Sequence, residues 1–235
     1  MGGGLLVTGT GTGVGKSVVS AALLAAIVAD GQPARAYKPA VTGLEEPPGA
    51  WPPDHELLAA MAGMAPEEVA PLRYGPAVSP HLAAELAGEP IDPERVVKSA
   101  QEALRRANTE GATLVVEGVG GLLVPLAERF TVRDFAVRVG LALLIAASPG
   151  LGTINHTLLT VEAARAAGLQ VRAVVLTPWP AQPSAMARSN RETIARLGDV
   201  EVATLDYVQA PESHALARAA GQLPWRRWLA SANSA

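Results

Sequence analysis

Continuous apolar runs alternate with longer segments of helical pattern along most of the chain. The runs lie at 4–9, 34–39, 113–118, 141–148 and 171–177, with a weaker one at 201–207. Apolar runs of this length predict strands buried on both faces. The segment 17–31 predicts a crossover helix that ends at Gly31. The segment 153–168 predicts another, with Thr153 as its N-cap and Gly168 as its end. We therefore predict an α/β fold with a doubly wound, mostly parallel sheet flanked by helices.

A long proline-rich segment, roughly 43–93, separates the second apolar run from the third. It contains two short helical patterns, "DHELLAAMAG" and "SPHLAAELAG". Connections of this length are more often functional than idle. Sequence alone assigns no role to "EEPPGAWPP" (45–53) beyond that of a variable flap over a site. Because no repeat or low-complexity linker divides the chain, we predict one domain over residues 1–235.

Composition narrows the classes of function. The chain has 235 residues with 19 basic and 22 acidic side chains, and no dense run of Lys or Arg, so we expect no nucleic-acid partner. It has no cysteine, which excludes thiol nucleophiles, disulfides and Cys-bound metals. The apolar stretch 18–29 is shorter than the roughly 20 residues that span a bilayer, and it lacks the basic flank of a signal peptide. We expect no membrane partner and a cytoplasmic location.

"GTGTGVGKS", residues 9–17, connects the first apolar run to the first helical pattern. Its alternating glycines allow successive N–H groups to point at phosphate oxygens. Lys16 adds a full positive charge, the helix N-terminus adds a partial one, and the Ser17 hydroxyl suits a magnesium ion. We interpret this stretch as a P-loop that binds a nucleoside triphosphate.

The spacing departs from the common P-loop, because five residues separate Gly9 from Gly15 instead of four. The competing interpretation is a dinucleotide loop, G-x-G-x-x-G, but its third glycine would fall on Val14. Gly-Lys-Ser at a helix start also has no role in a dinucleotide loop. The P-loop is therefore favoured, and on the P-loop alone a simple kinase stays open.

Two charged residues, Glu117 and Lys38, follow predicted strands, and a third, Asp54, opens a helical pattern. Glu117 follows the apolar "TLVV" and precedes "GVGG", which favours a role in binding magnesium or positioning water over a structural carboxylate. Lys38 follows "ARAY", where a site lysine and a solvated strand-end lysine carry equal weight. Asp54 opens "DHELL", and its own position favours a helix N-cap.

The remaining polar and aromatic features predict structural roles. His55, His81, His156 and His214 share no ligand spacing, although the second and third lie in better-placed loops. No nucleophile elbow is present. In "PWRRW", we expect Trp225 and Trp228 to pack on the body while the two arginines stay in solvent.

Several motifs together resemble the dethiobiotin synthetase family. They are "VTGTGTGVGKS", "YKPAVTG", "DHELL", "SPHLAAE", "VVEGVGGLLVPL" and "GLGTINHTLLT", which occur in the family's order from about residue 5 to 165. The resemblance implies a magnesium-dependent carbon-nitrogen cyclo-ligase of biotin biosynthesis. Its substrates would be 7,8-diaminononanoate, CO2 and ATP or another nucleoside triphosphate. The amine takes up CO2 as a carbamate, the γ-phosphoryl group activates it as a mixed anhydride, and the second amine closes the ring.

The resemblance also implies roles for residues around the phosphates and the metal. The residues that would wrap the nucleotide phosphates are Thr12, Gly13, Val14, Gly15, Lys16 and Ser17. Thr12, Lys16 and Lys38 would be catalytic, with Lys16 on the γ-phosphate and the carbamate. Ser17, Asp54 and Glu117 would surround Mg2+, which makes Asp54 a metal ligand in place of a cap.

On the substrate side the resemblance implies a homodimer with shared sites. Lys38 would bind the carbamate or phosphate, with Thr42 close to the substrate. Gly152, Thr153 and Asn155 would reach across the dimer to the substrate carboxylate, for which the free N–H groups of a helix start are suited.

One departure from the family concerns the nucleotide base. Many members have an Asn-containing turn after the strand that matches "VRAVVL", whereas this chain continues "TPWPAQP". Thr177 and Trp179 are the candidate base-site residues, and the indole either stacks on a base or shields it.

A second class of function stays open, a nucleotide-switched partitioning or scaffolding ATPase with a similar strand-loop-helix start. Such switches usually carry a lysine early in the loop, where this chain has Gly11. Dimerisation that requires nucleotide would favour the switch, and a constitutive dimer would favour the ligase.

Overall fold

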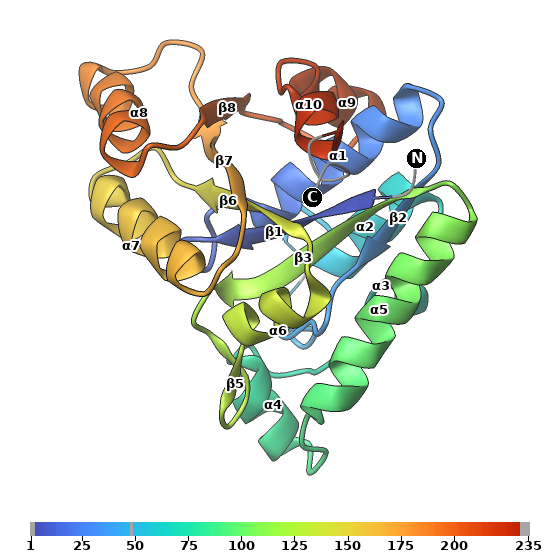
Figure 1. The fold of residues 1–235 in the computed structure, drawn as a ribbon. Coiled ribbons are helices and arrows are strands. Elements are labelled where there is room, and N and C mark those ends of the chain that lie inside the picture. Colours follow the sequence, from blue (N-terminus) through green and yellow to red (C-terminus); the bar gives the residue numbers. More distant parts are fainter. Residues whose placement is uncertain (1–2, 48, 231–235) are drawn as a thin grey trace.

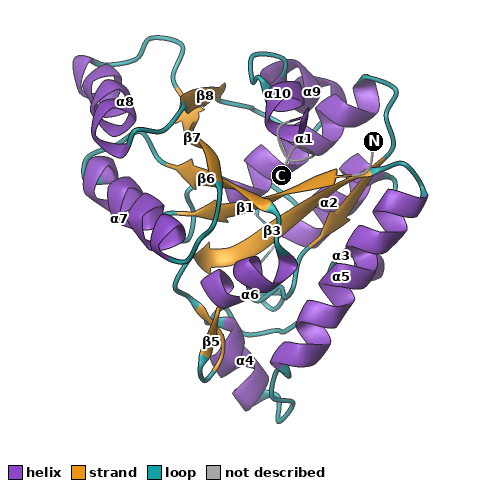
Figure 2. Ribbon diagram, in the orientation of Figure 1, coloured by secondary structure: helices purple, strands orange, loops and turns teal. Residues whose placement is uncertain are grey.

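A six-stranded parallel sheet forms the centre of the protein, with helices on both of its faces (Figures 1 and 2). The computed structural model describes residues 3–47 and 49–230. The strand order is β2-β3-β1-β6-β7-β8, and every neighbouring pair is parallel. The strands are β1 (Gly3–Gly9), β2 (Ala34–Tyr37), β3 (Thr113–Gly121), β6 (Ala142–Ala147), β7 (Val171–Trp179) and β8 (Val202–Asp206). A separate antiparallel hairpin pairs β4 (Pro125–Ala127) with β5 (Phe130–Thr131).

The helices divide between two hydrophobic layers. One layer holds α1 (Lys16–Ala29), α2 (Asp54–Ala62), α3 (Pro66–Val69), α9 (Ser213–Ala220) and α10 (Trp225–Ala230). The other holds α4 (Pro80–Leu86), α5 (Pro93–Thr109), α6 (Val132–Val139), α7 (Thr153–Ala166) and α8 (Ala185–Gly198). Because side chains alternate along a strand, Leu5 and Val7 of β1 enter the first layer while Leu6 enters the second. Burial on both faces explains why the strands read as continuous apolar runs.

The α/β fold and its parallel sheet are confirmed, and two expected helix caps are wrong. Gly152, with φ of 88°, is the N-cap of α7, and Thr153 is its first helical residue. The Thr153 hydroxyl instead lies 3.3 Å from Thr157 Oγ1. Likewise Pro53 is the N-cap of α2, and Asp54 is the first helical residue, which frees its carboxylate for other contacts. A glycine or proline at the cap has no side-chain acceptor, so neither helix start is capped from within.

Several strands end at other residues than expected, at the edge of the sheet formed by their carboxyl ends. β2 ends at Tyr37, so Lys38 lies just beyond the strand, whereas β3 runs on to Gly121 and β7 to Trp179. The helix α5 and the hairpin β4–β5 were not predicted. Pro48, in the segment to which sequence gave no role, lies outside the described residues.

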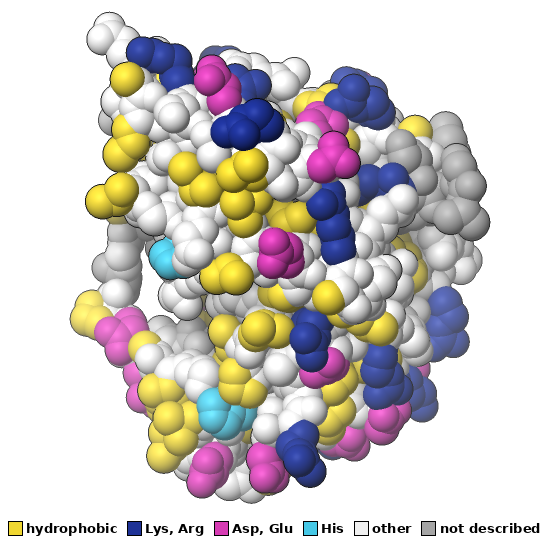
Figure 3. Space-filling view, turned by 60° about the vertical axis from the view of Figure 1, so that its left-hand side comes forward, with side chains coloured by type: hydrophobic (Ala, Val, Ile, Leu, Met, Phe, Trp, Pro, Cys, Tyr) yellow, Lys and Arg dark blue, Asp and Glu magenta, His cyan; other side chains and the backbone are white. Residues whose placement is uncertain are grey.

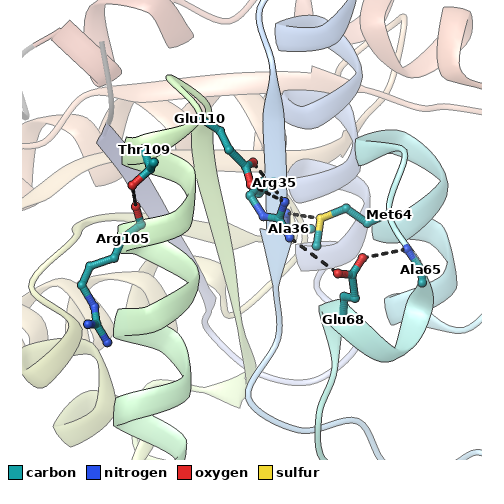
Figure 4. Close-up of polar contacts among 8 residues, drawn as sticks. All are labelled: Arg35, Ala36, Met64, Ala65, Glu68, Arg105, Thr109 and Glu110. Atoms are coloured by element: carbon teal, nitrogen blue, oxygen red, sulfur yellow. Dashed lines mark hydrogen bonds and ion pairs between the residues drawn. The ribbon is translucent and has the colours of Figure 1, made fainter.

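Polar contacts cover the edge strand β2, as Figure 4 shows. The amide of Ala36 donates to Met64 Sδ at 3.3 Å. Arg35 Nη1 lies 3.0 Å from Glu110 Oε2 and its Nη2 lies 3.9 Å from Glu68 Oε1. Exposed strand edges otherwise invite pairing with another chain. The contacts to α3 and the end of α5 thus hold in place the strand that leads to Lys38.

The C-terminal helix behaves as its sequence predicts. Trp225 and Trp228 are only 3% and 2% exposed, whereas the side chains of Arg226 and Arg227 are 63% and 65% exposed. Arg226 stacks on Trp225 and pairs with Asp30. Among the described residues, no helix has the length and apolar character needed to cross a membrane.

Candidate functional site

The glycine-rich loop between β1 and α1 leaves a helix start without an internal cap. Gly13 and Gly15 have φ of 73° and 89°, in the region that favours glycine. Gly15 is the N-cap of α1 and has no side-chain cap hydrogen bond. The first N–H groups of α1 are therefore available to an anionic ligand, as a P-loop requires.

Lys16 is folded back into this loop. Its Nζ donates to the carbonyl oxygen of Gly11 at 2.8 Å, and the residue is 7% exposed. Burial lowers the pKa of Lys16, and the nearby charge of Lys38 acts in the same direction, against the opposing carboxylates of Glu117 and Asp54. When a triphosphate binds, Lys16 Nζ would exchange the carbonyl oxygen of Gly11 for a negatively charged phosphate oxygen.

A second buried lysine lies between two carboxylates. Tyr37 pairs with Val116 across β2 and β3, which brings the following residues, Lys38 and Glu117, side by side. Lys38 Nζ lies 2.5 Å from Glu117 Oε1 and 2.8 Å from Asp54 Oδ2. Lys38 and Glu117 are 2% and 0% exposed. The pair is thus removed from solvent, with Asp54 contributed by the start of α2.

Burial and ion pairing act in opposite directions on this cluster. Burial alone would lower the pKa of Lys38, but the charges of Glu117 and Asp54 outweigh it and raise the pKa above its ordinary value. Burial would raise the pKa of Asp54, but Lys38, the Ser17 hydroxyl and Lys16 together lower it to about 2. Lys38 is therefore a fixed cation, and Asp54 a fixed anion, at neutral pH.

The oxygen atoms beside Ser17 fit a magnesium ion. Ser17 Oγ lies 2.7 Å from Asp54 Oδ1 and 2.9 Å from Glu117 Oε1, and the buried Glu117 Oε2 has no hydrogen-bond partner. Within residues 3–47 and 49–230, no three His, Cys, Asp or Glu side chains form a site for a metal by themselves. Two carboxylates and a hydroxyl suit Mg2+, which takes its remaining ligands from phosphates and water.

A cavity of about 790 Å³ joins these groups. Eight of the predicted site residues line it: Thr12, Gly13, Gly15, Lys16, Ser17, Lys38, Thr42 and Asp54. Glu117 lies behind Lys38 and Ser17, in contact with both. Two lysines, the P-loop and the oxygen atoms suited to Mg2+ therefore surround a single cavity.

The residues expected to bind the substrate carboxylate lie elsewhere. Gly152 and Asn155 are exposed and Thr153 is buried at the start of α7, and none of the three lines the cavity. Leu151, just before them, is 93% exposed. Within one chain, the structure does not bring this segment together with Lys38.

The two candidate base-site residues differ in their surroundings. Thr177 is 2% exposed and packs against the P-loop, since a Cβ added to Gly15 would lie 2.6 Å from Thr177 Cγ2. Trp179 is 9% exposed and belongs to the hydrophobic core, which leaves little of its indole free to stack on a base. The shielding interpretation of Trp179 fits this burial better than stacking.

Sequence reasoning missed several residues of the cavity wall. Trp51 and Pro52 line the cavity from the proline-rich segment, and Ser79 and Pro80 line it from the start of α4. The only sequence signal for Trp51 was its place in a connection that is long for its fold. For Ser79 the signal was the quoted "SPHLAAE" motif, which had been given no chemical role.

A family model and named relatives match most of this chain. A family model described as an AAA domain matches residues 3–229. A protein of Anaeromyxobacter sp. (strain Fw109-5), named ATP-dependent dethiobiotin synthetase BioD, is 42% identical over 207 residues, covering 84% of this chain and 90% of the relative. A protein of the same name from Mycobacterium marinum is 41% identical over 194 residues, covering 82% of each chain.

Solved structures share the fold at lower sequence identity. The MinC:MinD cell division protein complex of Aquifex aeolicus matches with a TM-score of 0.54 and 16% identity, over 92% of this chain and 86% of that chain. Apo McdA of Cyanthece matches with a TM-score of 0.53 and 11% identity, over 92% of this chain and 90% of that chain. At these identities the likeness concerns the P-loop α/β fold alone.

Proposed function

Because the chain belongs to the family of ATP-dependent dethiobiotin synthetases, carbon-nitrogen cyclo-ligases of biotin biosynthesis, we propose that it converts 7,8-diaminononanoate, CO2 and ATP into dethiobiotin, ADP and phosphate. The observation that carries this proposal is the second buried lysine. Lys38 lies in the same cavity as Lys16, held by Asp54 and Glu117. Transfer of the γ-phosphoryl group to a carbamate brings two anions together, and a second cation on the acceptor side offsets their repulsion.

The first proposed step forms and activates a carbamate. One substrate amine adds to CO2 and loses a proton, and a carbamate oxygen then attacks the γ-phosphorus as the bond to the ADP oxygen breaks. Lys16 leaves the Gly11 carbonyl to contact the γ-phosphate, and the loop residues from Thr12 to Ser17 hold the phosphates by their N–H groups. Lys38 lies on the acceptor side and binds the carbamate, with Thr42 nearby.

The second proposed step closes the ring. The free amine attacks the carbamoyl carbon, the carbon–oxygen bond to phosphate breaks, and the nitrogen loses a proton. Phosphate leaves with the electron pair, and the two lysines compensate its charge. Ser17, Asp54 and Glu117 would hold Mg2+, which when bound supplies a Lewis-acid charge for the phosphate oxygens.

We also propose that two copies complete the site, because Gly152 and Asn155 are exposed at the start of α7 and lie outside the cavity of their own chain. Exposed apolar side chains lie next to it: Leu151 is 93% exposed, and Leu123 and Leu159 are each 56% exposed. Figure 3, which brings the α7 and α8 side forward, shows several groups of apolar side chains on this face. Such patches are typical of surfaces covered in an assembly.

The test is a reconstituted reaction. The protein is incubated with diaminononanoate, bicarbonate, Mg2+ and either ATP or CTP, and dethiobiotin is measured by mass spectrometry. We expect product that requires every component, and the two nucleotides show how strongly the "TPWPAQP" turn selects the base. Folded protein that hydrolyses ATP but gives no product with either nucleotide would contradict the proposal.

A further inference from the structure

We infer that Lys38 makes the two metal-binding carboxylates unavailable to free divalent cations, so that the metal enters the site only together with the nucleotide. This rests on the proposed function, in which Ser17, Asp54 and Glu117 hold Mg2+, and it concerns how these groups are controlled before the nucleotide binds. The observation that carries it is that Lys38 contacts the same carboxylates that a metal ion would use.

The oxygen atoms of the two carboxylates are nearly all engaged. Ser17 Oγ lies 2.7 Å from Asp54 Oδ1 and 2.9 Å from Glu117 Oε1. Lys38 Nζ lies 2.8 Å from Asp54 Oδ2 and 2.5 Å from the same Glu117 Oε1. Of these carboxylate oxygens, the buried Glu117 Oε2 alone has no hydrogen-bond partner among the described residues. A divalent cation beside Ser17 would therefore share both carboxylates with the Lys38 ammonium group.

Repulsion between the two cations would be poorly screened. Lys38 is 2% exposed and Glu117 is 0% exposed, so little water lies between the charges, and buried charges interact more strongly than exposed ones. Lys38 also cannot move into solvent freely, because Glu117 would then be a buried charge without a counter-charge. A free cation must therefore bind against the charge of Lys38, which lowers its affinity.

The charged side chains at the cavity balance one another. Lys16, Lys38 and Asp54 line the cavity and Glu117 lies directly behind them, so two positive charges accompany two negative ones. A free divalent cation would leave the site with excess positive charge. A triphosphate carries more negative charge than one divalent cation neutralises, so the phosphates remove this excess. The balance of charge thus favours the metal–nucleotide complex over the free metal.

The bound phosphates also provide Lys38 with another anionic partner. Lysine carries its charge at the end of a flexible stem, so Nζ can exchange a carboxylate oxygen for an oxygen of the γ-phosphate or the carbamate. Asp54 and Glu117 are then free to bind the metal. Lys38 serves first as the counter-charge of the carboxylates and then as the partner of the acceptor, which couples the binding of nucleotide to the binding of the acceptor.

The experiment measures the binding of Mn2+, a substitute for Mg2+ that is visible by electron paramagnetic resonance, to protein without nucleotide. We expect Lys38→Met to bind Mn2+ at least about tenfold more tightly than the unaltered protein, because the repelling charge is gone and both carboxylates remain. Mn2+ should also raise the melting temperature of Lys38→Met, and change that of the unaltered protein by less than about 1 °C. Adding Glu117→Gln to Lys38→Met removes one carboxylate and should abolish both gains.

Arg35 provides the matched control. It lies on β2, the strand that leads to Lys38, and it also contacts two carboxylates (Figure 4). Its Nη1 lies 3.0 Å from Glu110 Oε2 and its Nη2 lies 3.9 Å from Glu68 Oε1, but the glutamate side chains are 48% and 52% exposed. Arg35→Met should therefore leave Mn2+ binding as weak as it is in the unaltered protein.

Two results would overturn the inference. One is equal Mn2+ affinity of the unaltered protein and Lys38→Met, and Lys38→Gln gives the same comparison if Lys38→Met does not fold. The other needs no variant: saturation of the unaltered protein below about 0.1 mM Mn2+. Because these measurements use neither diamine nor ATP, they are separate from turnover. A difference in Mn2+ affinity together with no dethiobiotin from the unaltered protein would overturn the proposed function alone.

Discussion

The carboxyl ends of the parallel strands form the edge of the sheet where ligands bind, and the two halves of this edge differ in how fully one chain organises them. At the ends of β1, β2 and β3, Ser17, Lys38, Asp54 and Glu117 contact one another at 2.5 to 2.9 Å. After β6, the segment Gly152–Asn155 begins α7 at the surface and takes no part in the cavity that the described residues form.

One chain fixes the geometry of the buried charged cluster, but it does not fix what contacts the exposed start of α7. A buried lysine with two carboxylates holds its geometry without a ligand, because each charge would be costly to bury alone. An exposed helix start has no such requirement, since water satisfies its N–H groups. The phosphoryl-transfer half is therefore preorganised, and we expect the half that binds the substrate tail to become complete in a dimer.

The largest expected effect comes from removing the cation of the preorganised half. Lys38→Met should lower kcat/KM by about a thousandfold or more, because the carbamate loses its charged partner. It should also reduce the free energy of unfolding by about 3–5 kcal/mol, since Glu117 stays buried without its counter-charge. Turnover and urea unfolding measure the two effects.

A second variant keeps this test independent of folding. Lys38→Met combined with Glu117→Gln removes both buried charges, so we expect stability to return toward that of the unaltered protein while activity stays lost. Recovery of turnover in the double variant would show that the lysine serves stability and not chemistry.

A smaller effect tests whether the exposed half belongs to the partner's site. Asn155→Ala should raise the KM for the diamine about tenfold through loss of a hydrogen bond to the substrate carboxylate. When it is mixed and re-associated with the Lys38→Met/Glu117→Gln chain, each mixed dimer carries one site with no lesion. About a quarter of all sites, and of the activity, should then return. Activity equal to the mean of the separate proteins would show that each chain uses its own Asn155.

The sequence predicted one half of this edge much better than the other. The P-loop and the parallel strands followed from local patterns, because glycine spacing and apolar runs reflect backbone geometry and burial directly. Lys38 and Asp54 were ambiguous, because their meeting depends on the register of β2 with β3 and on the path of the proline-rich segment. The roles of Trp51 and Ser79 at the cavity could not be predicted, since no local pattern reports which loop faces a cavity.

The smallest expected effect is on the fold itself, from Leu151→Asp at the exposed segment. Leu151 is 93% exposed, so the free energy of unfolding of one chain should change by less than about 0.5 kcal/mol. If Leu151 packs against a second copy, the added charge must be buried, and the dissociation constant of the dimer should rise by about tenfold or more.

Leu197→Asp is the matched control. Leu197 is 58% exposed at the end of α8, next to Gly198. The carbonyl of Gly198 accepts a hydrogen bond from Arg165, near the far end of α7. Analytical ultracentrifugation of both variants should show weaker association for Leu151→Asp alone. Equal association of the two variants would place the contact between copies away from the start of α7, and the exposed half would then have to be completed by other means than a partner chain.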